Sequence, residues 1–219
     1  MRIKYLLFDL DGTIVDSADG IIACTQKALY EIGEEPPAYE FLKTQIGPPI
    51  SKYFKTYFKG DEAKAKSTMQ IFRKHYLEIG VTTGNNILYN GVLDLLSFCK
   101  KEGYTLFVVT MKAADLSEKI LEAFGILSIF KTVYGNDHSG SVQKKSLLIQ
   151  ELINNQEELQ TSECLLIGDR QNDIHSAKEV GIRSIGVTWG YGTQKELKDA
   201  GADFVFHTPI ELETFLKRL

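Results

Sequence analysis

The sequence predicts an α/β protein with a doubly wound parallel sheet and an inserted block of helices. The chain opens with a short apolar run, Ile3 to Phe8, of the kind that is buried on both faces of a parallel sheet. No strand pattern interrupts residues 17–80. From Gly91 onward helical and strand patterns alternate, which favours right-handed crossovers between parallel strands.

The helical block follows the first strand and its loop. Ser17 is placed to cap a helix that runs to about Ile32. Ser51 is a plausible cap for an aromatic-rich helix, and Asp61 for a longer one that Gly80 ends. A helical block of this length between a first strand and the next βα unit is typical of an inserted domain. We therefore expect an α/β core domain of residues 1–16 and 84–219 and a helical domain of residues 17–83.

The second half of the chain supplies the other elements of the sheet. The predicted strands are Tyr104–Thr110, Lys131–Tyr134, Cys164–Ile167, Arg183–Val187 and Asp203–Phe206. The predicted helices are Val92–Lys101, Ala113–Phe124, Lys145–Asn154, Asp173–Val180 and a last helix that the capping box Thr208-Pro209-Ile210-Glu211 opens. In such sheets ligands bind beyond the carboxyl ends of the strands, so the residues at those ends are candidates for a site.

Composition narrows the classes of function. The chain has 219 residues, 43% of them hydrophobic and 25% charged, which is ordinary for a globular protein. A net charge of −4, with scattered lysines and arginines, favours neither nucleic acid nor a membrane as partner. Three cysteines without a C-x-x-C pair indicate reduced thiols and a cytoplasmic location. Asp9 interrupts the first apolar run too early for a signal peptide, and no stretch is long enough to span a membrane.

Acidic residues stand at the end of the first strand. Asp9 and Asp11 are two positions apart, so an extended backbone directs both carboxylates to the same side. Two crowded carboxylates repel each other and are costly to desolvate unless a cation or a shared proton compensates them. This pair therefore favours a metal site. Thr110 ends another strand, where its hydroxyl is suited to bind a phosphoryl oxygen or, alternatively, to cap the next helix.

A second acidic group follows a later strand. Gly168 and Asp169 come directly after Leu165–Ile167, and Asp173 lies about one helical turn further on. Alone, this string could be a strand-to-helix turn with a capping aspartate. Together with Asp9 and Asp11 at the same edge of the sheet, it indicates a functional site.

These strings resemble the motifs of a known family. Asp9-Leu10-Asp11-Gly12-Thr13 resembles the first motif of the haloacid dehalogenase-like superfamily, most of whose members are magnesium-dependent phosphatases. Gly168-Asp169-Arg170-Gln171-Asn172-Asp173 resembles its fourth motif, in the form found among phosphoglycolate phosphatase-like members. The lysine of the third motif should open a helix upstream of that strand. Lys144 and Lys145 both qualify, and we prefer Lys144 because Lys145 would sit further into the helix.

The resemblance implies a two-step phosphoryl transfer. Asp9 would attack phosphorus and become an aspartyl phosphate, while Asp11 would protonate the leaving oxygen and then activate water. Thr110 and Lys144 would hold the transferring oxygens.

The resemblance also implies a Mg²⁺ ion and a cap. The Asp9 carboxylate, the Asp11 backbone carbonyl and Asp169 would hold the ion, and Asp173 would support them. The inserted helices would form the family's small helical cap, which closes over the substrate.

The expected function is therefore hydrolysis of a small phosphomonoester, with phosphoglycolate, sugar phosphates and nucleotides all open as substrates. Three other interpretations remain. A phosphosugar mutase similar to β-phosphoglucomutase would use the same aspartates but return the phosphoryl group to a sugar. A phosphate-accepting regulatory domain would also place acidic residues, a threonine and a lysine at strand ends, but it would lack the inserted helices. A non-catalytic scaffold would have no need of every reacting residue type. The sequence does not indicate an oligomeric state.

Overall fold

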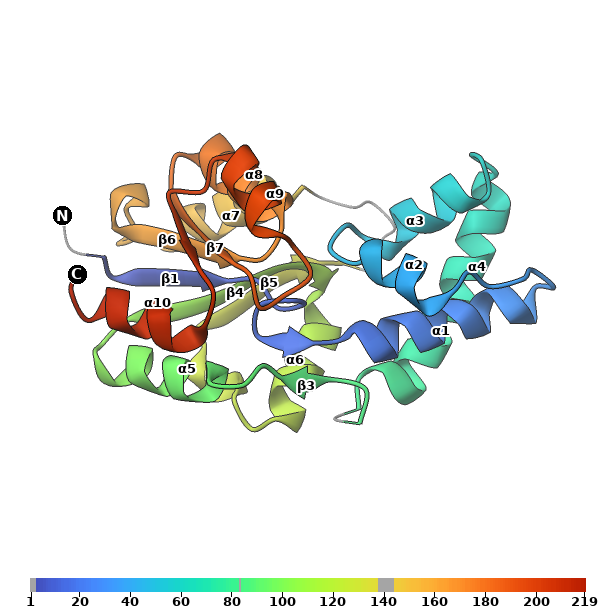
Figure 1. The fold of residues 1–219 in the computed structure, drawn as a ribbon, viewed down its shortest axis with the longest axis horizontal. Coiled ribbons are helices and arrows are strands. Elements are labelled where there is room, and N and C mark those ends of the chain that lie inside the picture. The colour runs from blue at the N-terminus through green and yellow to red at the C-terminus, as the bar shows by residue number, and fades with distance from the viewer. Residues whose placement is uncertain (1–2, 83, 138–143) are drawn as a thin grey trace. The chain divides into compact units, whose positions relative to one another are not determined.

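The computed structural model describes residues 3–82, 84–137 and 144–219 (Figure 1). The chain divides into two compact units. Unit 1 comprises Met1–Asp16 with Leu88–Leu219, and unit 2 comprises Ser17–Ile87. The second boundary thus follows residue 87, where the sequence analysis placed it after residue 83. A short two-stranded sheet, β2 (Val15–Asp16) with β3 (Ile87–Leu88), lies where the chain passes between the units.

Unit 1 is built on a six-stranded sheet. Its strands are β1 (Tyr5–Phe8), β4 (Thr105–Ala113), β5 (Thr132–Asn136), β6 (Cys164–Gly168), β7 (Arg183–Val187) and β8 (Phe204–Phe206). Their spatial order is β5-β4-β1-β6-β7-β8, and every neighbouring pair is parallel. This order runs outward in both directions from the first strand. The predicted doubly wound α/β fold is confirmed.

Helices cover both faces of this sheet. They are α5 (Val92–Lys101), α6 (Ala114–Ala123), α7 (Lys145–Asn154), α8 (Gln171–Val180), α9 (Gln194–Ala200) and α10 (Pro209–Leu216), with 3₁₀ turns at Leu127–Ile129 and Thr161–Glu163. Figure 1 shows α7, α8 and α9 on one side of the strands and α5, α6 and α10 on the other. The sequence analysis had not assigned α9. Thr208 caps α10 as expected, but the Glu211 side chain accepts from the backbone N–H of His207, one residue before the position a capping box uses.

The apolar first strand lies in the centre of the sheet, as its composition predicts. Leu7 is fully buried and packs with Phe107 of β4, Leu166 of β6 and apolar residues of α7 and α8. In the strand register Phe8 lies opposite Val108 on one side and Ile167 on the other. The carboxyl ends of β1, β4 and β6 therefore lie level with one another, and the residues that follow them meet at one edge of the sheet.

β4 is longer than expected and irregular at its end. The sequence analysis ended this strand at Thr110, whereas the structure continues it to Ala113. Its pairing with β5 shifts register between Val109 and Ala113. The extension places Met111 and Lys112 within the strand instead of in a loop before α6.

Unit 2 is helical, as predicted for the inserted block. Its elements are α1 (Ala18–Glu31), α2 (Tyr39–Thr44), α3 (Ile50–Tyr57), α4 (Glu62–His75) and a π-helical turn, Tyr76–Gly80, that continues α4. The Asp61 side chain caps α4 by accepting from the backbone N–H of Lys64 at 3.0 Å. Ser17 occupies the N-cap position of α1, but its side chain makes no capping bond. The predicted cap at Ser51 is wrong, because α3 already begins at Ile50.

Aromatic side chains form much of the interior of unit 2. Phe54 of α3 lies edge-on to Phe72 of α4, with ring centroids 6.1 Å apart. Tyr76 stacks on Phe72 at 5.4 Å and is almost fully buried. Such contacts add to the free energy of burial, so this unit has a core of its own.

Candidate active site

Asp9 follows β1 directly and lies at the centre of the candidate site. Its residue is 8% exposed, and its backbone N–H donates to the carbonyl of Ile167 at the end of β6. One carboxylate oxygen, Oδ1, accepts from the backbone N–H of Leu10 at 2.8 Å. Backbone bonds thus fix both the position of Asp9 and the rotation of its side chain.

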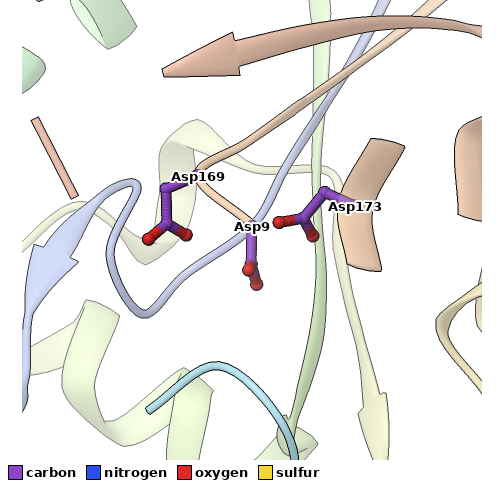
Figure 2. A group of neighbouring side chains, drawn as sticks. All are labelled: Asp9, Asp169 and Asp173. Atoms are coloured by element: carbon purple, nitrogen blue, oxygen red, sulfur yellow. The ribbon is translucent and has the colours of Figure 1, made fainter. Parts of the chain in front are cut away.

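Asp169 and Asp173 come from β6 and α8. Asp169 follows the last residue of β6 and is fully buried, and Asp173 lies in the first turn of α8 at 1% exposure. Figure 2 shows Asp9 between these two side chains. One carboxylate oxygen from each of the three lies within 4.8 Å of the others. The structure therefore brings together three of the acidic residues that the sequence analysis selected.

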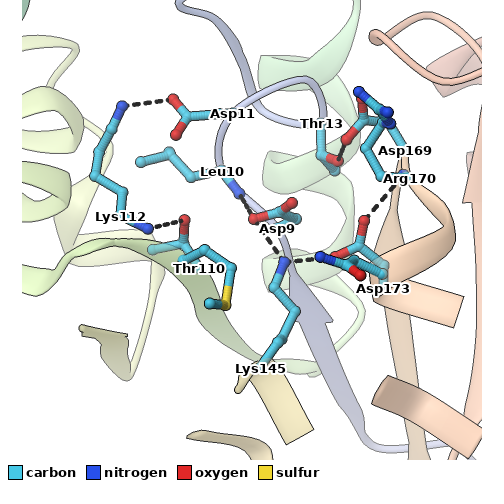
Figure 3. A network of polar contacts seen from close by, with 12 residues as sticks. Asp9, Leu10, Asp11, Thr13, Thr110, Lys112, Lys145, Asp169, Arg170 and Asp173 are labelled. Carbon is cyan, nitrogen blue, oxygen red and sulfur yellow. Dashed lines mark hydrogen bonds and ion pairs between the residues drawn. The ribbon is translucent and has the colours of Figure 1, made fainter. Parts of the chain in front are cut away.

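Lys145, and not Lys144, contacts these carboxylates. Lys145 Nζ lies 2.9 Å from Asp9 Oδ1 and 2.5 Å from Asp173 Oδ1 (Figure 3). Lys145 is the first residue of α7 and is 4% exposed, whereas Lys144 is the N-cap residue and is exposed. The preference for Lys144 is therefore corrected. It rested on helix depth, but the first helical residue here faces the sheet edge and the N-cap residue faces solvent.

Burial raises the pKa values of Asp9 and Asp169. Burial raises the pKa of Asp9 to about 7, since it and the neighbouring Asp173 outweigh the opposing effect of Lys145. Burial, and then the charges of Asp173 and Asp9, raises the pKa of Asp169 well above its ordinary value. For Lys145, burial lowers the pKa, but the two carboxylates outweigh it and raise the pKa above the ordinary range.

The group fits a divalent cation. Within the described residues it contains three buried carboxyl groups and one ion-paired ammonium, that of Lys145, which leaves two negative charges when all three carboxyls are ionised. Carboxylate oxygens are the ligands that hard divalent cations prefer. Asp173 is already engaged through both oxygens, because Oδ1 contacts Lys145 and Oδ2 accepts from the backbone N–H of Arg170 at 3.0 Å. Asp169 Oδ2 accepts from the backbone N–H of Tyr191, but among the described residues its Oδ1 accepts only a long hydrogen bond of 3.5 Å from the Thr13 hydroxyl. Asp9 and Asp169 are therefore the better candidates for direct ligands.

Asp11 and Thr110 lie beside this group. Asp11 Oδ1 forms an ion pair of 2.7 Å with Lys112 Nζ from the end of β4 (Figure 3). Thr110 is buried, and its hydroxyl accepts from the backbone N–H of Lys112 at 3.2 Å. The sequence analysis did not select Lys112. It could have been noticed because it follows Thr110 by two positions, which places both on one face of an extended strand.

Residues 189–192 pack against the loop that follows β1. The indole N–H of Trp189 donates to the carbonyl of Thr13 at 3.0 Å, and the backbone N–H of Tyr191 donates to Asp169 Oδ2 at 2.7 Å. A Cβ atom on Gly190 would lie 2.0 Å from the carbonyl oxygen of Gly12, so only glycine fits there. The sequence analysis gave these residues no role. In the structure they hold Asp169.

Comparison with known proteins agrees with this geometry. The profile of the haloacid dehalogenase-like hydrolase family matches residues 6–187. The chain is 34% identical to a 5'-nucleotidase from Pseudomonas aeruginosa over 198 residues, covering 90% of this chain and 88% of the relative. It is 28% identical to a phosphoglycolate phosphatase from Colwellia psychrerythraea, covering 98% and 97%. The crystal structure of a predicted phosphatase from Clostridium acetobutylicum superimposes with a TM-score of 0.93 at 32% identity, covering all of both chains.

A membrane-spanning element is not found, since none of the helices in the described ranges is long and apolar enough to cross a bilayer.

The sheet order, the acidic group at its carboxyl edge and the family match over most of the chain lead to the same assignment. The chain belongs to the haloacid dehalogenase-like hydrolases.

Proposed function

We propose that this enzyme is a phosphatase that hydrolyses a small phosphomonoester through an aspartyl phosphate on Asp9. The observation that carries the proposal is the environment of the Asp9 carboxylate, which is buried, fixed by Leu10 and paired with Lys145 beside Asp169. A fixed carboxylate, a cation for the phosphoryl oxygens and an acidic metal-binding group are the parts that phosphoryl transfer needs.

Asp9 and Asp11 would carry the covalent steps. A carboxylate oxygen of Asp9 attacks phosphorus, the bond from phosphorus to the leaving oxygen breaks, and Asp11 gives its proton to that oxygen. Water then attacks the same phosphorus while Asp11 takes a proton from it. The bond between phosphorus and Asp9 breaks, phosphate leaves, and both side chains return to their starting states.

Lys145 and Thr110 would bind the phosphoryl oxygens. Lys145 carries an ammonium at the Asp9 carboxylate, so it is placed to neutralise negative charge on the group being transferred. Thr110 follows the part of β4 that pairs with β1. Its buried hydroxyl can donate one hydrogen bond to a phosphoryl oxygen while it accepts another. Lys145 takes the role that the sequence analysis gave to Lys144.

Asp9, Asp169 and the backbone carbonyl of Asp11 would hold a Mg²⁺ ion, with Asp173 in support through Lys145 and the start of α8. When bound, the ion supplies charge neutralisation at the phosphoryl oxygens. The balance of charge among the described side chains supports a divalent ion, and their oxygen donors favour a hard one.

The substrate class follows from the relatives. One is named a 5'-nucleotidase and another a phosphoglycolate phosphatase, so 5'-nucleotides and small phosphorylated acids are the first candidates. The helical unit 2 would act as the cap that closes over them, since phosphoryl transfer to water is favoured by a site that excludes bulk solvent.

The test is phosphate release from a panel of phosphomonoesters, which includes nucleoside 5'-monophosphates, phosphoglycolate and hexose phosphates. We expect release that stops with EDTA, returns with Mg²⁺ and is absent from Asp9→Asn. Transfer of the phosphoryl group to a second sugar phosphate, without phosphate release, would identify a mutase instead. No turnover of any substrate with Mg²⁺ would contradict the proposed function.

A further inference from the structure

The ion pair between Asp11 and Lys112 stands apart from the acidic group. Lys112 Nζ lies 2.7 Å from Asp11 Oδ1, and the two side chains are 8% and 15% exposed. A lysine that is this buried loses most of its hydration, and ion pairs often do not recover the free energy that this costs. Its presence in the site therefore calls for a reason other than stability.

Neighbouring residues of β4 and β5 hold the backbone around Lys112 in place. The Thr110 hydroxyl accepts from the backbone N–H of Lys112 at 3.2 Å. The side-chain amide of Asn136, at the end of β5, donates to the carbonyl of Met111 at 2.8 Å. A Cβ atom on Gly135 would lie 2.6 Å from the carbonyl oxygen of Lys112, so glycine is needed for β5 to approach it. These contacts coincide with the register shift between Val109 and Ala113.

The irregular end of β4 thus holds the Lys112 side chain against the carboxylate of Asp11. Asp11 lies in the turn after β1, where an isolated bridge to Val15 holds its backbone but leaves its carboxylate to be oriented by other side chains. Lys112 lies in the irregular stretch of β4 beyond its pairing with β1, where the contacts of Thr110, Asn136 and Gly135 fix its backbone. An ammonium from this strand that contacts Asp11 Oδ1 restricts the rotation of the Asp11 carboxylate.

We propose that Lys112 is a positioning residue that orients Asp11 for proton exchange with the leaving oxygen. This inference rests on the proposed function. Lys112 keeps its own protons throughout and holds Oδ1, so that Oδ2 gives its proton to the leaving oxygen in the first step and takes one from water in the second. Positioning of an acid contributes most where the leaving oxygen needs its proton.

The dependence of kcat on the leaving group separates a positioning role of Lys112 from a structural role or a role in substrate binding. An alkyl phosphate such as a nucleoside 5'-monophosphate releases a strongly basic alkoxide unless it is protonated. p-Nitrophenyl phosphate releases a stable phenolate that needs little protonation. We expect Lys112→Met to lower kcat for the nucleotide by about 10- to 100-fold, at or below the low end of what general acid catalysis supplies because Asp11 itself remains, with KM little changed. For p-nitrophenyl phosphate we expect a several-fold smaller loss.

Controls make the result specific. Lys112→Arg should recover part of the loss, because it restores a cation next to Asp11. Lys178→Met removes a lysine of unit 1 whose ammonium donates to the carbonyl of Ala200 at 2.7 Å, and it should leave both substrates unaffected. In an Asp11→Asn background, Lys112→Met should cause no further loss on the nucleotide.

Three results would overturn the inference. Equal losses on both substrates would indicate a structural role, and a rise in KM with unchanged kcat would indicate substrate binding. A full additional loss in the Asp11→Asn background would show that Lys112 acts independently of Asp11. If Lys112→Met does not fold, Lys112→Gln takes its place in the same comparison. If the wild type does not hydrolyse the nucleotide, the alkyl phosphate of the panel that it does hydrolyse takes the nucleotide's place in the comparison. A wild-type enzyme that hydrolyses no phosphomonoester of the panel would contradict the proposed function itself.

Discussion

The site has an inner part and an outer part, and they differ in how their charges are held. The inner part, made of Asp9, Asp169, Asp173 and Lys145, is almost fully buried and belongs to the central strands and the helices that follow them. The outer part, the pair of Asp11 with Lys112, is less buried and joins a loop to the irregular end of a strand. Charges in the inner part are costly to bury unless a cation compensates them. Charges in the outer part can be arranged for proton transfer.

The largest effect should come from the centre of the inner part. Asp9→Asn removes the nucleophile but keeps the shape and the acceptor for the N–H of Leu10. We expect turnover to fall by about 10⁴-fold or more, as for loss of other nucleophiles. The thermal unfolding midpoint should stay close to that of the wild type. Near-normal phosphate release by the purified variant would remove Asp9 from its proposed role.

The next effect tests the choice between the two lysines. Lys145→Met leaves the carboxylates of Asp9 and Asp173 without their ion pair. We expect a loss of about 3 kcal/mol in the free energy of unfolding, as for other broken buried pairs. Activity should fall by about 10²- to 10³-fold, as when one electrostatic contact to the transition state is removed.

Lys144→Met is the matched control, because it removes the neighbouring but exposed lysine. Its change in the free energy of unfolding should stay within about 0.5 kcal/mol, as for ordinary surface positions. Urea unfolding and phosphate release measure both variants. If Lys144→Met proved the more damaging of the two, the corrected assignment would be wrong.

A smaller effect should come from the loop that holds Asp169. Gly190→Ala places a methyl group 2.0 Å from the carbonyl oxygen of Gly12 and 2.6 Å from Asp169, so the loop must move. We expect Mg²⁺ affinity to weaken by about 10-fold, as for other groups that orient a ligand. Stability should fall by about 1 to 3 kcal/mol.

Titration of activity with Mg²⁺ measures the effect of Gly190→Ala. Gly84→Ala is the control, since the closest atom to its added Cβ lies at 4.0 Å. An unchanged Mg²⁺ dependence for Gly190→Ala would show that the loop does not position Asp169.

The sheet could be predicted because its strands carry their signal locally. The strand over Arg183–Val187 was predicted with its observed bounds, since an apolar run bounded by a turn glycine needs no distant information. Helix α9 was missed because Gln194–Ala200 is short and mostly polar, and its capping residue, Thr193, follows a glycine-rich loop. Helix α2 is shorter still and follows two prolines.

The inner carboxylates could be predicted for the same reason, since they directly follow strands. The lysines that pair with the carboxylates of the site could not be predicted. The choice between Lys144 and Lys145 depends on which way the first turn of α7 faces, and residues 138–143 before it carry no pattern that sets this rotation. Lys112 depends on the irregular end of β4, which the contacts of Asn136 and Gly135 create from another strand. Such contacts between distant segments leave no periodic trace in the sequence.

The position of β1 in the sheet has a consequence for synthesis of the chain. β1 is made first, but its neighbour β6 is made about 160 residues later, after β4 and β5. Until Cys164–Gly168 leaves the ribosome, one side of this very apolar strand has no native partner. A nascent or truncated chain that stops before β6 therefore exposes an open strand edge, which is the kind of surface that chaperones bind and that leads to aggregation.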